Sequence, residues 1–241
     1  MRLIDTHSHL FLEEFSEDFP QVIERARAAG VTHIFMPNID STTIEAMLSA
    51  CSVYKGYCFP MIGLHPTSVN ANYEKELEIV ARELKFSKEY VAIGEIGMDL
   101  YWDKTYLKEQ QIVLDKQVNW ALEYDLPIVI HCRDAFDYIY KVLEPYKKTP
   151  LRGIFHSFTG TAEEATRVLE FSDFFIGING VVTFKKSHLP EILAGIPLEK
   201  IVLETDSPYL TPVPNRGKRN ESAYVKDTLT VSYTHLTLPT T

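Results

Sequence analysis

The chain has 241 residues, of which 45% are hydrophobic and 24% charged, and its formal net charge is −9. This charge argues against a surface coated in basic side chains for nucleic acid, but it is compatible with a local basic patch or bound cations. No run of 18 apolar residues occurs, so no membrane-spanning helix is expected. The chain starts without the basic and apolar segments of a signal peptide, and its three cysteines form no CxxC pair, which favours a reduced, cytoplasmic location.

Eight short apolar runs in the sequence predict β-strands. Most of them are aliphatic or β-branched on both faces, which fits buried parallel strands better than half-exposed antiparallel strands. In chain order, the predicted strands cover residues 2–6, 32–37, 58–63, 90–95, 127–131, 152–156, 174–178 and 200–205.

Segments with helical character lie between these strands. Residues 161–171, for example, open with a capping-box pattern from Thr161 to Glu164. Because strands alternate with helices, the sheet is expected to be parallel, and eight such pairs in this length predict a closed (β/α)8 TIM barrel, an α/β fold. A doubly wound open sheet is the alternative. The predicted helices cover residues 16–30, 41–56, 106–125, 161–171 and 221–229.

The end of the sequence departs from this pattern. Residues 230–241, "TVSYTHLTLPTT", are rich in threonine, alternate like a strand and contain Pro239. They are not expected to continue the helix that starts at residue 221. The sequence therefore predicts one domain over residues 1–229, with an incomplete last helix, and an atypical tail over residues 230–241 outside the fold.

Polar side chains stand where the predicted strands end, and in a (β/α)8 barrel the active site lies at the carboxyl ends of the strands. Histidine together with carboxylate suits zinc, manganese or similar ions, and a bridging carboxylate can hold two ions about 3.5–4 Å apart. Each such side chain alone has an ordinary structural explanation. Together they favour a metal site, because every buried polar group would otherwise need its own hydrogen-bond partner. The residues are His7, His9, His65, Glu95, His131, His156, Glu204 and Asp206.

Two of these residues keep a second interpretation. Glu204 can orient its neighbours from inside the barrel, although strand alternation puts it on the same face as Asp206. His65 can serve either packing or the orientation of a neighbouring group. Both are therefore candidates for the site without an assigned role at this point.

Six short motifs together resemble those of the TatD family of metal-dependent deoxyribonucleases. They occur in order between residues 5 and 210, and the resemblance continues through "TPVPNRGKRNE" to about Leu229. It implies a barrel of the metal-dependent hydrolase type that binds two or three divalent ions, with Mg²⁺, Mn²⁺ and Zn²⁺ as candidates. The motifs are "DTHSHL", "GLHP", "GEIGMD", "HCRDA", "HSFTG" and "ETDSPYL".

The implied reaction is hydrolysis of a DNA phosphodiester bond, exonuclease-like, by a monomer that needs no protein partner. Glu95, as the bridging ligand, and Asp206, which would orient or deprotonate the attacking water, are the catalytic candidates. His65 and Arg133 are expected to bind the substrate phosphate, since arginine offers a forked set of donors. Carried over by position, the metal ligands are His7, His9, Glu95, His131, His156 and Asp206.

A basic loop follows the last predicted strand. Arg216, Lys218 and Arg219 are candidates for binding the DNA backbone, and a solvated basic turn explains them equally well. The same two interpretations apply to Lys185 and Lys186 after the seventh strand.

Two other functions stay open. An amidohydrolase or lactonase acting on a small molecule shares the H-x-H opening, but such enzymes commonly bridge their metals with a modified lysine near the fourth strand, where this chain has Glu95. An inactive barrel that serves as a binding protein is the other alternative. The complete ligand set argues against it, and the atypical tail argues for it.

Overall fold

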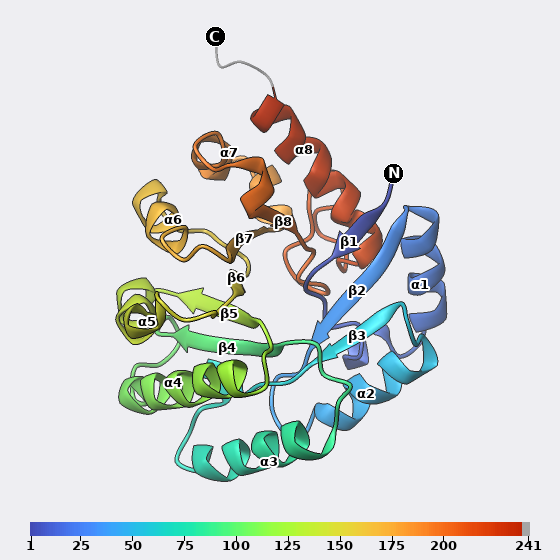
Figure 1. The fold of residues 1–241 in the computed structure, drawn as a ribbon. Coiled ribbons are helices and arrows are strands. Elements are labelled where there is room, and N and C mark those ends of the chain that lie inside the picture. The colour runs from blue at the N-terminus through green and yellow to red at the C-terminus, as the bar shows by residue number, and fades with distance from the viewer. Residues whose placement is uncertain (238–241) are drawn as a thin grey trace.

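The computed structural model describes residues 1–237, of which residues 233–237 are described as backbone only. Helices surround a central set of parallel strands (Figure 1). The strands are β1 (Leu3–Asp5), β2 (Val31–Pro37), β3 (Cys58–Met61), β4 (Ile93–Asp99), β5 (Ile128–Arg133), β6 (Gly153–Phe155), β7 (Phe174–Ile178) and β8 (Ile201–Leu203).

The strands follow one another in chain order, as the sequence predicts for a (β/α)8 architecture. Hydrogen-bonded pairing is continuous within β1–β2–β3 and within β4–β5–β6–β7–β8, and all pairs are parallel. Single bridges join the two arcs, from Ile62 to Ile93 at one seam and from Ser8 to Ser207 at the other. The prediction of a closed barrel is therefore wrong in this detail. At each seam the neighbouring strands share a single bridge instead of a continuous ladder of hydrogen bonds.

Two strands end at other residues than the sequence predicts, and this difference changes where the site residues lie relative to the strands. The fourth strand runs over Ile93–Asp99 rather than residues 90–95, so Glu95 lies inside the strand and not at its end. The first strand ends at Asp5, so His7 and His9 follow it and flank Ser8, the bridge residue. Strand-like alternation continues through this bridge, which keeps the two imidazoles on one face.

The helices α3 and α5 have no counterpart among the helices predicted above. In α3 the residues Leu77, Val80 and Leu84 are buried, a helical spacing that the sequence displays. The helix α5 buries its apolar side in the same way. The helices are α1 (Phe19–Ala28), α2 (Ile44–Val53), α3 (Tyr73–Phe86), α4 (Leu107–Glu123), α5 (Phe136–Leu143), α6 (Ala162–Val168), α7 (Leu189–Leu193) and α8 (Val225–Thr237).

The last helix is longer than the sequence suggested. It does not end near Leu229 but runs to Thr237, and it packs against β1, β8 and residues 180–183. Val225, Thr228 and Ser232 are buried at helical spacing, and the Ser232 hydroxyl donates to the Thr228 carbonyl at 2.9 Å. The Thr230 hydroxyl donates in the same way to the Lys226 carbonyl at 2.9 Å, so a Thr-rich segment can be helical. Residues 238–241 of the predicted tail lie outside the described residues, and its separation from the fold stays a prediction.

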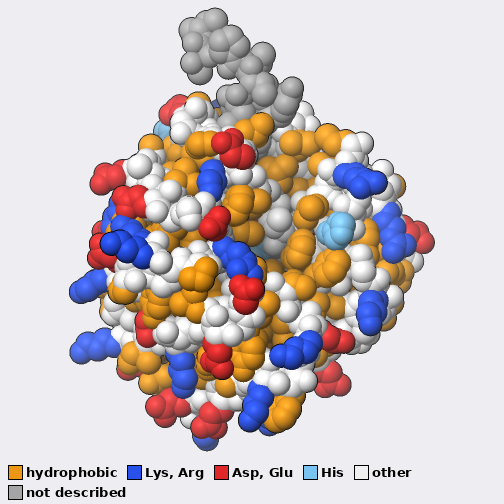
Figure 2. Space-filling model, in the orientation of Figure 1, with side chains coloured by type: hydrophobic (Ala, Val, Ile, Leu, Met, Phe, Trp, Pro, Cys, Tyr) orange, Lys and Arg blue, Asp and Glu red, His pale blue; other side chains and the backbone are white. Residues whose placement is uncertain are grey.

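Charged side chains of both signs are interspersed over the face that Figure 2 shows, with hydrophobic side chains between them. This pattern agrees with the acidic overall composition, because no extended basic surface is visible on this face. Among the described residues, no helix combines the length and the hydropathy that a bilayer crossing requires.

Candidate metal centre

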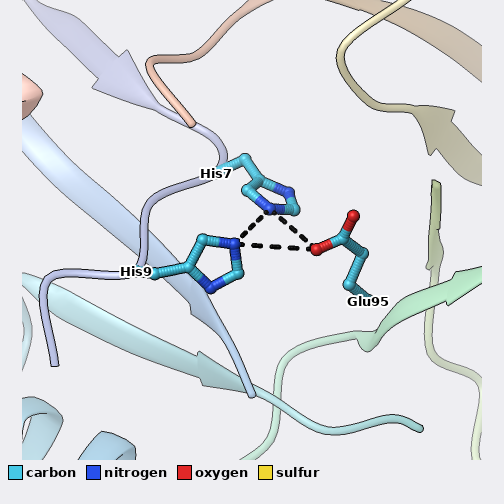
Figure 3. A group of neighbouring side chains, drawn as sticks. All are labelled: His7, His9 and Glu95. Atoms are coloured by element: carbon cyan, nitrogen blue, oxygen red, sulfur yellow. Dashed lines mark hydrogen bonds and ion pairs between the residues drawn. The ribbon is translucent and has the colours of Figure 1, made fainter. Parts of the chain in front are cut away.

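The two early histidines and Glu95 face one another across the strand ends (Figure 3). The Nε2 atoms of His7 and His9 lie 3.2 Å apart, and they lie 3.2 and 3.6 Å from Oε2 of Glu95. All three side chains are buried. Two ring nitrogens and a carboxylate oxygen this close cannot all be satisfied by hydrogen bonds to each other, whereas a cation between them would satisfy all three.

The second oxygen of Glu95 lies close to three further histidines. Oε1 lies 2.8 Å from Nε2 of His156, 2.9 Å from Nδ1 of His131 and 3.4 Å from Nε2 of His65. One carboxylate thus contacts five imidazoles, which come from both arcs of the sheet. A carboxylate shared in this way has the geometry of a bridging ligand.

Asp206 lies on the other side of the first histidine pair. Its Oδ1 is 3.7 Å from Nε2 of both His7 and His9. The backbone N–H of Asp206 donates to the His7 carbonyl at 2.9 Å, so the two residues are held together across the β1–β8 seam. Asp206 adopts a φ of 57°, a left-handed conformation that aspartate tolerates better than most residues.

Oxygen acceptors behind three of the rings fix which nitrogen faces the centre. Nδ1 of His9 lies 3.2 Å from the Pro37 carbonyl, and Nε2 of His131 lies 2.9 Å from Oδ2 of Asp99. Nδ1 of His156 lies 3.3 Å from Oε1 of Glu204. With a cation in the centre, the proton of each neutral ring would lie on the nitrogen that faces the outer acceptor, and the opposite nitrogen would present its lone pair to the cation. This is the arrangement of metal-ligating histidines.

His65 has the opposite arrangement. Its Nδ1 accepts the backbone N–H of Thr67 at 3.1 Å, so in the neutral ring the proton lies on Nε2, the atom that points toward Glu95. A protonated Nε2 is a hydrogen-bond donor rather than a metal ligand. The structure therefore brings His65 into the cluster, with a tautomer that suits contact with an anion.

The electrostatics of the cluster follow from burial and from the charges inside it. Burial lowers the pKa of His7 well below its usual value and that of His9 to about 4, which keeps both rings neutral. Burial acts to lower the pKa of His156 too, but the charges of Glu95 and Glu204 hold it well above its usual value. Burial raises the pKa of Asp206 to about 7. Protons thus balance the buried carboxylates, and a bound divalent ion would replace them.

Three groups of donor atoms in the described residues lie close enough to hold an ion, and the third group would need His65 in its other tautomer. Within each group the candidate ligand atoms lie within 4.8 Å of one another. Nδ1 of His7 is buried without a hydrogen-bond partner among the described residues, which leaves this ring free to adopt the tautomer that a ligand needs. The residues present therefore fit a metal centre. The groups are His7, His9 and Glu95; His7, His156 and Asp206; and His65, Glu95 and His131.

Hydrogen bonds from Asp5 position the loop that carries Asp206. The buried Asp5 carboxylate accepts the Thr205 backbone N–H at 2.9 Å and the Thr205 hydroxyl at 2.7 Å. On the opposite side, Gly97 lets β4 approach β5: a side chain there would lie 2.0 Å from the His131 carbonyl. Asp5 and Gly97 thus bring the two sides of the centre together.

The cations singled out in the sequence take different positions. Arg133 lines the same cavity as the histidines. Arg219 is bound by Asp18 at 2.8 Å and lies over the Phe15 ring at 4.4 Å, so its guanidinium already has protein partners. In the part of the chain that the structure describes, Arg216, Lys218, Arg219, Lys185 and Lys186 do not line this cavity.

Asp99 is a site residue that the sequence analysis missed. Besides its contact with His131, it accepts the Tyr101 backbone N–H at 3.0 Å and its own N–H donates to Gln110 at 2.9 Å. The signal was present in "GEIGMD", where Asp99 follows Glu95 by four residues on a strand, and therefore on the same face. Glu204, expected beside Asp206, instead lies behind His156.

Parallel strands inside a ring of helices, with imidazoles and carboxylates converging at the carboxyl ends of the strands, define a metal-dependent hydrolase of the amidohydrolase-like barrel type. The comparisons with known proteins are more specific. The model of the TatD related DNase family matches residues 4–239, and the chain belongs to this family.

Two relatives and one solved structure show the extent of the similarity. The chain is 39% identical over 225 residues to an uncharacterized metal-dependent hydrolase, YabD, of Bacillus subtilis, covering 93% of this chain and 87% of the relative. It is 32% identical over 229 residues to a 3'-5' ssDNA/RNA exonuclease, TatD, of Pantoea ananatis, with 92% and 87% covered. The crystal structure of YJJV, a TatD homologue from Escherichia coli, superposes with a TM-score of 0.91 at 29% identity, covering 99% of this chain and 92% of that one.

Proposed function

We propose that this protein hydrolyses phosphodiester bonds of DNA with two or three divalent metal ions held at the centre around Glu95. The observation that carries the proposal is the set of ring contacts: His9, His131 and His156 each have an oxygen acceptor behind the ring, whereas Nδ1 of His65 accepts an N–H. With cations in the centre, the first three rings would turn lone pairs inward, and His65 would turn its Nε2–H inward. Lone pairs suit cations, and an N–H beside them suits the phosphate that the cations would bind. The exonuclease activity named for the Pantoea relative supports the choice of a nucleic-acid substrate.

In this proposal Glu95 would hold two ions, because its two oxygens face different histidines. His7 and His9 would hold one ion, and His131 and His156 would hold the second. Asp206 completes the first position from across the seam. The proposed ligands are His7, His9, Glu95, His131, His156 and Asp206.

Bound divalent ions would polarise the phosphate and lower the pKa of a coordinated water. Asp206 accepts the proton of the water that attacks phosphorus, since its carboxylate borders the His7 and His9 pair and the open cavity. The new P–O bond forms as the ester P–O bond breaks, and the departing oxygen takes up a proton from solvent. His65, through Nε2–H, and Arg133, through its guanidinium, bind the phosphate oxygens.

We also propose, as the sequence suggested, that the enzyme is a cytoplasmic monomer without an obligate protein partner. The basic loop at Arg216 and Lys218 would contact the DNA backbone outside the cavity, and both side chains are exposed.

The test is a degradation assay with 5′- and 3′-labelled single- and double-stranded DNA in Mg²⁺, Mn²⁺ or Zn²⁺. We expect metal-dependent shortening of at least one labelled strand, with no turnover in excess chelator. A small-molecule ester and a lactone serve as parallel substrates. Turnover of these together with intact DNA under every metal condition would replace the proposal with the amidohydrolase or lactonase alternative.

A further inference from the structure

Two aromatic side chains beside the metal centre are unusually open to solvent. Trp102 is 72% exposed and Tyr101 is 54% exposed, and both lie in the loop after β4, which ends at Asp99. A tryptophan normally buries most of its surface, so an exposed tryptophan at the border of a polar cavity suggests that a ligand covers it. The fold does not explain the pair, because Tyr101 and Trp102 are absent from the groups of residues that form or pack on the hydrophobic core among the described residues.

Both side chains border the space where a substrate of the centre would lie. Trp102 lines the cavity of about 700 Å³ that also contains His65, His131 and Asp206. Tyr101 lines a neighbouring cavity of about 600 Å³, and Arg133 lines both. The aromatic pair and Arg133 therefore stand at the junction of the two cavities.

The pair is held in place before any ligand binds. The rings of Tyr101 and Trp102 meet edge to face, with centroids 4.9 Å apart. The Arg133 guanidinium lies 3.9 Å from the Tyr101 ring centroid and 5.3 Å from that of Trp102. The Tyr101 backbone is fixed by the Asp99 carboxylate, which also contacts His131 of the centre. A rigid aromatic surface loses little entropy when a ligand covers it.

We propose that Tyr101 and Trp102 form a stacking platform for an unpaired nucleobase of the strand whose phosphate lies at the metal centre. This inference rests on the proposed function and adds the part of the substrate that the centre itself does not bind. An aromatic ring recognises the flat face of a base, and a cation beside it attracts the phosphate on the same nucleotide. In a duplex the base faces are covered by their neighbours, so the platform selects a single strand or a frayed end.

Binding is measured on the metal-loaded protein with phosphorothioate-linked oligothymidylate, which resists cleavage, and with an abasic oligonucleotide of the same length and linkage. Trp102→Ala should weaken binding of oligothymidylate by about 5- to 150-fold, the range that loss of one base–aromatic stack spans. Binding of the abasic strand should stay unchanged, since its phosphates are the same. Trp102→Phe, which keeps a ring, should restore most of the affinity.

Intrinsic fluorescence gives a second readout, because the chain has two tryptophans, Trp102 and the partly buried Trp120. Oligothymidylate should quench the wild-type signal, the abasic strand should not, and Trp102→Phe should lose the quench. Phe86→Ala is the matched control: Phe86 is 77% exposed with the Lys85 amine 5.5 Å from its ring centroid, but it ends α3, where the chain turns back toward the start of β4.

The outcomes separate this inference from the proposed function. If DNA is hydrolysed but Trp102→Ala binds both oligonucleotides like the wild type, or loses affinity for both equally, the platform is wrong and the proposed function stands. If oligothymidylate binds with the expected quench but DNA is cleaved with none of the three metals, the platform stands and the proposed function is wrong.

Discussion

Glu204→Gln tests how the protein holds His156 ready for a metal ion. The Glu204 carboxylate is fully buried; its Oε1 accepts the Ser157 backbone N–H at 2.5 Å and lies 3.3 Å from Nδ1 of His156. Glutamine keeps the shape but removes the charge that favours a proton on Nδ1, and with it the inward lone pair. Loss of such a partner typically lowers metal affinity 10- to 100-fold, which corresponds to about 1.4–2.8 kcal/mol.

Glu204→Ala should act more strongly on the fold. It leaves the Ser157 N–H without its acceptor, at about 1–3 kcal/mol, and it removes the carboxylate that lies 3.3 Å from Nδ1 of His156. Zn²⁺ titration by calorimetry measures the affinity of Glu204→Gln, and thermal unfolding without metal measures the stability of both variants. We expect Glu204→Gln to unfold near the wild-type temperature and to bind Zn²⁺ at least tenfold more weakly.

The matched control for this experiment is Glu76→Gln. Glu76 also accepts two hydrogen bonds, from the backbone and hydroxyl of Ser41, but among the described residues no histidine forms an ion pair with it. The Zn²⁺ affinity of the Glu76→Gln variant should equal that of the wild type. Wild-type Zn²⁺ affinity in Glu204→Gln would refute the argument that this carboxylate sets the tautomer of His156.

Three further predictions concern regions outside the centre. Replacing Arg216 and Lys218 by alanine should reduce the salt slope of single-strand binding by about 0.7 per lost phosphate contact; an unaltered slope means that the loop is a solvated turn. Arg219 and Arg25 bind the Asp18 carboxylate and lower its pKa in the folded protein. Asp18 therefore stabilises the fold at pH values above its unfolded pKa of about 3.9. This contribution is lost as the pH falls through the lower pKa that Asp18 has in the folded protein. Asp18→Asn should therefore unfold at a lower temperature than the wild type at pH 7, with a smaller difference at pH 3; equal differences at both would contradict it. A chain that stops after Leu229 should melt below the full chain, since it lacks two turns of α8; equal melting temperatures would support a tail outside the fold.

The sequence predicted the parts of this molecule that depend on periodicity. Strand order, parallel pairing and the convergence of His7, Glu95 and His156 follow from apolar runs that end in polar residues, because parallel strands all end at the same side. The helix α3 carries an equally clear periodicity, and it was missed although its buried positions are three and four residues apart.

Other features depend on distances that periodicity does not contain. Asp99 and Glu204 act on the far nitrogens of His131 and His156, which only the folded backbone reveals. The length of α8 was missed for a different reason: its buried Thr228 and Ser232 are polar, so no apolar pattern marks them. The exposure of Trp102 is likewise invisible in the sequence, where tryptophan suggests a core position.

The most direct test of the metal centre compares the wild type with Glu95→Ala in elemental analysis of the purified proteins, together with hydrolysis of end-labelled DNA. Among the described residues, Glu95 is the one carboxylate that contacts five histidines, so its loss should remove the bridge between the ions. We predict at least two divalent ions per wild-type chain, fewer in Glu95→Ala, and loss of most hydrolysis in a variant that still folds. A wild-type protein without stoichiometric metal, together with a Glu95→Ala variant that degrades DNA at the wild-type rate, would contradict the proposed centre.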